Sequence, residues 1–137
     1  MKFYFDSSAL TKRYVFEKGS EAVDHLFLKA DTVLVGSICM PEIISALARL
    51  RREKKLTAHQ YGQCKRAVIE DFTSFDVCQI SGEVLRTSIQ ILERTDLRAM
   101  DALHVACAIQ AKASCFVSSD VRQTAAAKKF GLSVEAV

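Results

Sequence analysis

The stretch Lys2-Phe-Tyr-Phe-Asp6-Ser-Ser-Ala-Leu10 indicates how the whole chain is built. It begins with a short run of aromatic residues that favours a β-strand, and the run ends in an acid followed by two serines. Aspartate and serine are among the residues that most often cap helices, so we expect the strand to turn directly into a helix. The sequence therefore predicts a strand–helix unit with Asp6 at the carboxyl end of the strand.

The same alternation continues along the rest of the chain. The runs that predict further strands are residues 32–36, 76–80, 114–118 and 132–137. The segments expected to be helical are residues 9–15, 20–28, a long helix after Pro41, 57–75 with Thr57 as its cap, a helix marked on one face by Leu85, Ile89 and Leu92, 101–109 and 121–130. Alternating strands and helices predict the α/β class, with a central parallel sheet of four to five strands flanked by helices.

Composition favours one globular domain over residues 1–137. Half of the residues are hydrophobic, 26% are charged, and the chain has one proline and no low-complexity tract. Asp6 interrupts the first apolar run, and no segment approaches the roughly 20 apolar residues that cross a bilayer. The five cysteines are widely spaced and odd in number, which argues against a disulfide framework or a zinc site. We therefore expect a cytoplasmic protein with reduced thiols and no membrane partner.

Four acids occupy strand ends or first helical turns: Asp6, Glu42, Asp101 and Asp120. In parallel α/β sheets, ligands bind beyond the carboxyl ends of the strands, near the point where the strand order reverses. Oxygen ligands suit hard cations such as Mg²⁺ and Mn²⁺. Such an ion can activate a water molecule and stabilise charge on a phosphodiester. The four acids are therefore candidate catalytic and metal-binding residues.

Each acid also has a purely structural interpretation. Asp6 and Asp120 are suitable helix caps. Glu42 and Asp101 are suitable first-turn acids, which the helix dipole favours. Taken singly, the acids leave both interpretations open, and only their joint pattern favours a metal site.

Five stretches form a set of motifs: Phe5-Asp6-Ser7-Ser8-Ala9-Leu10, Pro41-Glu42, Arg98-Ala-Met-Asp101-Ala-Leu-His-Val-Ala106, Val117-Ser-Ser-Asp120, and residues 126–134 as the closing helix and strand. By these motifs the chain resembles the PIN-domain family, and specifically the VapC-type toxins of toxin–antitoxin pairs. These motifs occur in the family's order and cover essentially the whole chain. The family often has threonine where Ser118 stands, and serine keeps the hydroxyl group.

The resemblance implies a Mg²⁺- or Mn²⁺-dependent endoribonuclease whose RNA products carry a 5′-phosphate and a 3′-hydroxyl. It implies a metal pocket formed by the four acids, with supporting hydroxyls from Ser7, Ser8 and Ser118. It also implies a bacterial or archaeal host and a homodimer inhibited by a small VapB-like antitoxin whose tail enters the pocket. The residues before Asp6 and the helical hairpin after Glu42 are the expected dimer or antitoxin surfaces.

Other charged residues carry weaker signals. Lys12 and Arg13 follow Asp6 by one to two helical turns, so we expect them to flank the crevice and contact substrate. A net charge of +3 permits a polyanionic partner, and the basic run Arg49–Lys55 suits either RNA phosphates or, as we favour, the dipole of a helix end. His104 lies three residues after Asp101 on the same side of a helix, a position that suits a residue that orients an acid or acts as a base. The metal mechanism does not require it, and a core histidine is the favoured interpretation.

Alternative protein classes fit the sequence less well. A phosphoaspartyl enzyme of the haloacid dehalogenase type needs a second acid where Ser8 stands. A response-regulator receiver needs paired acids near the first strand and a lysine after a late strand, where Ser118-Ser119-Asp120 stands instead. No glycine-rich nucleotide-binding motif is present. The remaining alternative is a PIN-like binding module that acts mainly through antitoxin or nucleic-acid binding, with little nuclease activity.

Overall fold

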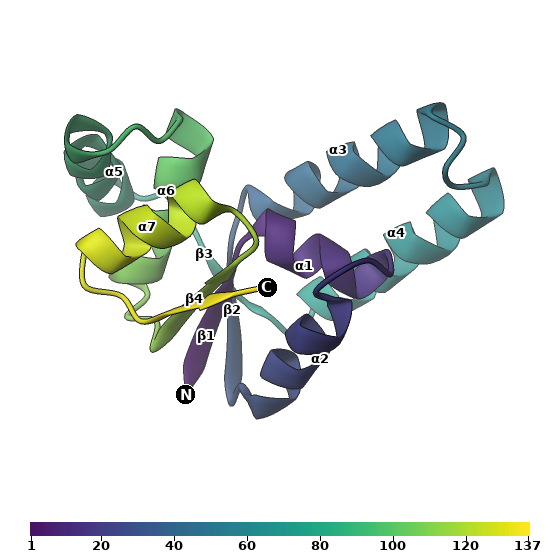
Figure 1. The fold of residues 1–137 in the computed structure, drawn as a ribbon, viewed down its shortest axis with the longest axis horizontal. Coiled ribbons are helices and arrows are strands. Elements are labelled where there is room, and N and C mark those ends of the chain that lie inside the picture. The colour runs from purple at the N-terminus through teal and green to yellow at the C-terminus, as the bar shows by residue number, and fades with distance from the viewer.

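A computed structural model describes all 137 residues as five strands and seven helices (Figure 1). The strands are β1 (Lys2–Phe5), β2 (Thr32–Gly36), β3 (Asp76–Cys78), β4 (Cys115–Ser118) and β5 (Val134–Ala136). The helices are α1 (Ser7–Tyr14), α2 (Ser20–Lys29), α3 (Cys39–Arg52), α4 (Ala58–Phe72), α5 (Gly82–Arg94), α6 (Ala99–Gln110) and α7 (Val121–Lys129). The α/β class with a parallel, helix-flanked sheet is confirmed.

The five strands form one sheet in the order β3-β2-β1-β4-β5, and every neighbouring pair is parallel. The central strand β1 pairs with β2 through Phe3 and Val33 and with β4 through Phe3 and Cys115. The strand order reverses between β1 and β4, which is where such sheets form a crevice at their carboxyl edge. Asp6 follows β1 and Asp120 lies just beyond β4, so both acids flank the reversal point.

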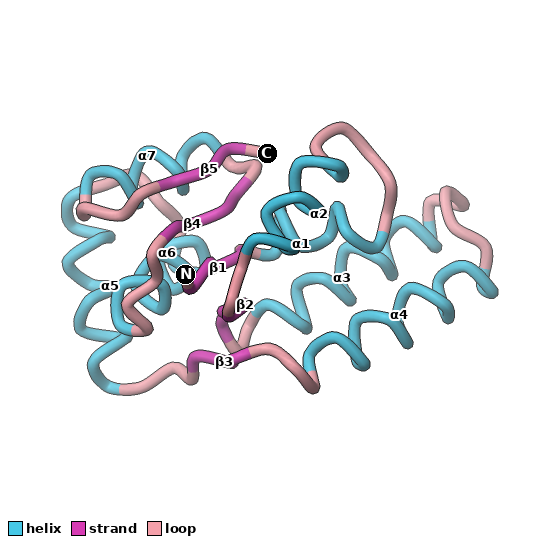
Figure 2. Tube along the Cα trace, turned by 90° about the horizontal axis from the view of Figure 1, so that it is seen from below, coloured by secondary structure: helices cyan, strands magenta, loops and turns pink.

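Helices cover both faces of the sheet, as Figures 1 and 2 show. Helices α1–α4 lie on one face, where Phe3 and Phe5 join a buried apolar cluster with Ile43 and Leu47. Helices α5–α7 lie on the other face, where Tyr4 joins a second cluster. Successive side chains of β1 alternate between these faces, as the pleat of a strand requires. A strand buried on both faces reads as a continuous apolar run.

The boundaries of several elements differ from those expected. Helix α3 begins at Cys39, two residues before Pro41, because proline is tolerated in a first helical turn where its missing N–H would have no partner. Helix α4 ends at Phe72, before the expected Phe75. Its predicted cap is confirmed: the Thr57 hydroxyl accepts from the Gln60 N–H, and the Gln60 side chain accepts from the Thr57 N–H.

The residues before Asp6 were expected to offer a docking surface, and this expectation is wrong. They form the central strand β1, which is paired on both edges, and Phe3, Tyr4 and Phe5 are buried. The other expected surface, the α3–α4 hairpin, projects away from the sheet (Figure 1).

Helix α5 turns the apolar stripe noted in the sequence toward solvent. Leu85, Ile89 and Leu92 are exposed, whereas Val84 and Ile91 are buried against α6. No helix of the structure has both the length and the hydropathy that crossing a membrane requires.

Candidate functional site

A hollow of about 250 Å³ lies at the carboxyl edge of the sheet, next to the reversal point. It is bounded by the first turns of α1, α3 and α6 and by the start of α7. The polar residues that line it are Ser7, Ser8, Thr11, Glu42, Asp101, His104, Asp120 and Gln123. Three of the four predicted acids and two of the predicted supporting serines therefore meet at one place.

Asp6, the fourth acid, lies beneath the hollow and is fully buried. Its Oδ1 accepts from the Ala9 N–H at 2.9 Å and from the Ser8 hydroxyl at 2.7 Å, and its Oδ2 accepts from the Ser118 hydroxyl at 2.6 Å. Burial raises the pKa of this carboxyl, against the opposing effects of His104 and these hydrogen bonds. Asp6 is therefore connected to the hollow through Ser8, which lines the hollow and donates a hydrogen bond to Asp6.

Glu42 stands in the first turn of α3 and is held by two neighbours. Its Oε1 accepts from the Ser7 hydroxyl at 2.6 Å and lies 2.5 Å from His104 Nε2. Burial alone would raise the pKa of Glu42, but the hydrogen bonds with His104 and Ser7 lower it. The carboxylate is therefore ionised at neutral pH.

Asp101 stands in the first turn of α6, opposite the start of α7. Its Oδ1 accepts from Nε2 of Gln123 at 3.1 Å. Burial raises the pKa of Asp101, and the negative charges of Asp120, Glu42 and Asp6 raise it further, while His104 opposes them. The acids thus repel one another across the hollow.

Asp120 is the N-cap of α7, and its Oδ1 accepts from the N–H groups of Arg122 and Gln123. Asp6 likewise caps α1 through the Ala9 N–H. The interpretation of these two acids as helix caps is therefore correct. It does not exclude a role in metal binding, because both carboxyl groups also belong to the acid cluster. Ser118, beneath Asp120, accepts from the Asp120 N–H while donating to Asp6.

The structure does not bring Lys12 or Arg13 to the hollow. Lys12 Nζ donates to Glu17 and to the carbonyl of Lys18. Arg13 contacts Asp71 and Asp24 and stacks 4.0 Å above the ring centre of Phe27. Both cations stabilise the outer face of α1, so the expectation that they flank the crevice is wrong.

The basic run also lies away from the hollow. It occupies the tip of the α3–α4 hairpin, whereas Glu42 lies at the opposite end of α3. Arg52 lies ten positions after Glu42 on the same helix, which is roughly 15 Å along the helix axis. No lysine or arginine lines the hollow, so the cluster has no positively charged side chain within it.

Three polar residues of the site, Thr11, His104 and Gln123, were not assigned to it from the sequence. His104 was expected to be a core histidine, and it is buried, but its Nε2 contacts Glu42. Its spacing from Asp101 was the only available signal. Gln123 has no sequence signal, because a glutamine in a polar helix is unremarkable until the fold brings it to Asp101.

The donor set fits a hard divalent cation. The hollow offers mainly carboxylate and hydroxyl oxygens, with the side chains of His104 and Gln123 beside them, and no cysteine, lysine or arginine lines it. No three acidic, histidine or cysteine side chains lie close enough to ligate one ion together. A cation such as Mg²⁺ keeps several of its waters and needs only one or two carboxylates, so this spacing suits a hydrated ion better than zinc.

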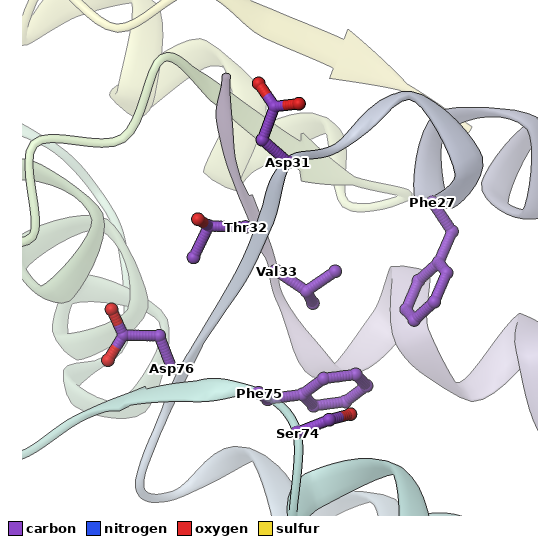
Figure 3. Close-up of a pocket in the computed structure, with 7 residues that line it drawn as sticks. All are labelled: Phe27, Asp31, Thr32, Val33, Ser74, Phe75 and Asp76. Atoms are coloured by element: carbon purple, nitrogen blue, oxygen red, sulfur yellow. The ribbon is translucent and has the colours of Figure 1, made fainter.

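A larger hollow of about 450 Å³ lies at the opposite edge of the sheet (Figure 3). Its lining includes Thr32 and Asp76, the first residues of β2 and β3, together with Phe27 and Phe75. Because it lies at the amino ends of these strands, it contains none of the clustered acids.

Comparisons with known proteins agree with this geometry. Residues 3–129 match the sequence model of the family described as the PIN domain. Ribonuclease VapC45 of Mycobacterium tuberculosis is 27% identical over 106 residues, which are 77% of this chain and 74% of the relative.

Solved structures of other proteins share the fold. VapC20 of Mycobacterium tuberculosis, described as a sarcin–ricin loop cleaving toxin, superposes with a TM-score of 0.69 at 16% identity, over 90% of this chain and 94% of the other. A toxin–antitoxin complex from Klebsiella pneumoniae gives a TM-score of 0.66 at 17% identity, over 89% of each chain.

Proposed function

This chain belongs to the PIN-domain family, and on that basis we propose that it is a metal-dependent endoribonuclease, the toxin of a VapBC-type toxin–antitoxin pair. The relative from Mycobacterium tuberculosis carries the name ribonuclease, which supports RNA as the substrate. We propose that the protein cleaves this RNA in the cytoplasm.

One observation carries the metal dependence: three acids face a hollow that no lysine or arginine lines, with a fourth acid buried beneath them. Burial and then the negative charge of Asp120 raise the pKa of Asp101, so ionising the whole cluster has a free-energy cost. A divalent cation removes that cost by neutralising the carboxylates, and it also allows a phosphate group to approach them. We favour Mg²⁺ or Mn²⁺ because the donors are oxygen atoms.

In the proposed mechanism one or two of the carboxylates of Glu42, Asp101 and Asp120 would bind the cation directly, the others would face its bound waters, and Asp6 adds negative charge from beneath. A bound ion of this kind supplies an activated water and stabilises charge on the scissile phosphate. Ser7 and Gln123 fix the orientation of Glu42 and Asp101. In-line attack by the water would leave a 5′-phosphate and a 3′-hydroxyl.

We also propose a homodimer that a small VapB-like antitoxin inhibits. A protein of similar fold is part of a toxin–antitoxin complex in Klebsiella pneumoniae. The excess of carboxylates in the hollow suits a basic side chain from the tail of such a partner. Sedimentation of the purified chain tests the dimer, and a mass of one chain at micromolar concentration would contradict it.

Cleavage of a labelled RNA pool tests the enzymatic proposal. Wild-type protein is assayed with Mg²⁺, with Mn²⁺ and with EDTA, beside the Asp101→Asn and Asp6→Asn variants. Asp76→Asn at the opposite edge of the sheet is the matched control, since it removes the same charge away from the site. We expect metal-dependent cleavage that falls at least about 100-fold in the site variants, a loss of several kcal/mol of transition-state stabilisation.

If wild type and the Asp101→Asn variant cleave RNA equally, the activity comes from a contaminating ribonuclease. The enzymatic proposal would then fail, and the chain would instead be a PIN-like binding module with little nuclease activity.

A further inference from the structure

A chain of hydrogen bonds runs from the centre of the sheet to the hollow. The hydroxyl of Tyr4, on the central strand, lies 2.8 Å from Nδ1 of His104, and Nε2 of His104 lies 2.5 Å from Oε1 of Glu42. Tyr4 and His104 are 0% and 1% exposed. These residues come from β1, α6 and α3, so the chain joins the central strand to one helix of each layer.

We assign the bond directions for a neutral His104, whose Nε2 also lies 3.0 Å from the Ser7 hydroxyl oxygen. If Glu42 binds a cation, its carboxylate is ionised and can only accept, so Nε2 of His104 carries the hydrogen that is donated to it. A neutral imidazole then has its acceptor at Nδ1, which accepts from the Tyr4 hydroxyl. The Ser7 hydroxyl donates to the same Oε1. Oε2 of Glu42 makes no hydrogen bond within the protein.

The Tyr4 end of this chain is held rigidly. Its ring stacks on Phe116 with 5.6 Å between ring centres and 7° between planes, and it meets the edge of the His104 ring. Gly36 on the neighbouring strand leaves room for the hydroxyl, because a Cβ there would lie 2.6 Å from it. Tyr4 therefore has little freedom to move away from His104.

We propose that Tyr4 and His104 form a positioning relay that fixes the Glu42 carboxylate for metal binding. By engaging Oε1, the relay leaves Oε2 to serve the cation. His104 is then a positioning residue and not a general base, since both of its ring nitrogens are engaged in the buried chain. A hydrogen-bond partner of this kind orients a metal-binding group and sets its basicity. This inference rests on the proposed metal site.

Two substitutions of His104 separate its two nitrogens. The amide nitrogen of glutamine reaches the position of Nε2, and that of asparagine reaches only the position of Nδ1. Titration calorimetry with Mn²⁺ alone, without RNA, measures the affinity. We expect His104→Asn to bind Mn²⁺ about 10- to 100-fold more weakly, and His104→Gln to remain within about threefold of wild type. His25→Asn is the matched control on the exposed surface of α2.

Tyr4→Phe keeps the ring and removes only the hydroxyl, so it tests the relay in a protein whose core is unchanged in shape. We expect an affinity loss smaller than that of His104→Asn. Folding of every variant is checked by circular dichroism.

The outcomes distinguish the relay from the site it serves. A wild-type protein that binds no Mn²⁺ would overturn the metal site, and the relay with it. If wild type binds Mn²⁺ but His104→Asn and Tyr4→Phe bind it equally well, only the relay is overturned. Equal losses of Mn²⁺ affinity in His104→Asn and His104→Gln would also overturn the relay. If the histidine served only packing, a glutamine amide nitrogen at the position of Nε2 would not restore the affinity.

Discussion

Gln123 joins α7 to α6 at the edge of the hollow by donating from its amide nitrogen to Oδ1 of Asp101 across 3.1 Å. The other end of the same amide, Oε1, is buried without a hydrogen-bond partner. An unpaired buried polar atom costs about 1–3 kcal/mol. Gln123 therefore orients an acid of the site at some cost to the stability of the fold.

The Gln123→Met substitution separates these two effects. Methionine matches the length of glutamine and has neither the N–H donor nor the unpaired oxygen. We expect the free energy of unfolding in urea to change by less than about 1 kcal/mol or to increase, while Mn²⁺ affinity measured by calorimetry falls. A large loss of stability with unchanged affinity would show that the residue serves only the fold.

Gly36 is predicted to be irreplaceable because of the Tyr4 hydroxyl, which a Cβ would approach to 2.6 Å. Gly36→Ala should destabilise the protein by about 1–3 kcal/mol, the usual cost of overpacking a core. The Tyr4→Phe/Gly36→Ala double variant should recover part of that loss, which a double-mutant cycle in urea measures.

Gly62→Ala is the matched control for this prediction. A Cβ at Gly62 would meet only the flexible end of Arg66 at 3.4 Å, within α4. Alanine favours a helix interior over glycine, so this change should stabilise by about 0.5–1 kcal/mol. Equal effects at the two glycines would refute the steric account of Gly36.

The pKa of Asp101 is predicted to fall when the charge of Asp120 is removed. Burial raises the pKa of Asp101 most, and Asp120 is the next largest contribution. Asp120→Asn keeps a residue that can cap α7, so the helix start should survive. A ¹³C NMR titration of side-chain carboxyl groups in metal-free protein measures the shift, with Asp76→Asn as the control.

The sign of the pH effect follows from the raised pKa. Asp101 stays protonated to higher pH in the folded than in the unfolded chain, so its contribution to stability is present at low pH and is lost as pH rises through its folded-state pKa. If the charges of Asp101 and Asp120 interact, Asp120→Asn should lower the pKa of Asp101, and the loss of stability should then occur at lower pH. An unchanged Asp101 titration would show that burial alone sets its pKa.

Helix α5 offers a test with one substitution at two sites. Ile91 is fully buried and Ile89 is 55% exposed, two residues away on the same helix. Ile91→Ala should cost about 2–5 kcal/mol, as a large-to-small change in a core does. Ile89→Ala should change stability by less than about 0.5 kcal/mol, as surface substitutions usually do. Thermal unfolding compares the two, and similar losses would mean that the outer face of α5 is covered.

Sequence patterns predicted the architecture of this protein because they depend on local properties. Alternating β-prone and helical runs required a parallel sheet, and parallel strands place their carboxyl ends at one edge. Asp6 and Asp120 could therefore be assigned to that edge from their positions after the first and fourth strands. The Thr57 cap was likewise predictable, because a cap is formed by neighbouring residues.

Side-chain direction around a helix was harder to predict. Lys12 and Arg13 are close to Asp6 in sequence, but each residue rotates the direction of its side chain by about 100° around the helix axis. Thr11 lines the hollow while Lys12 and Arg13 contact acids elsewhere. The apolar stripe of α5 was equally visible in the sequence, and only packing against α6 decided that Ile91 and not Ile89 is buried.

The sequence by itself thus determined the fold class and the edge at which the acids gather. The tertiary structure decided the depth of Asp6, the bond between Gln123 and Asp101, and the chain from Tyr4 through His104 to Glu42. Tyr4 and His104 are 100 residues apart, and His104 and Glu42 are 62 apart. Periodicity records which face of an element is apolar, but contacts between elements depend on how three layers pack, and no local pattern encodes those distances.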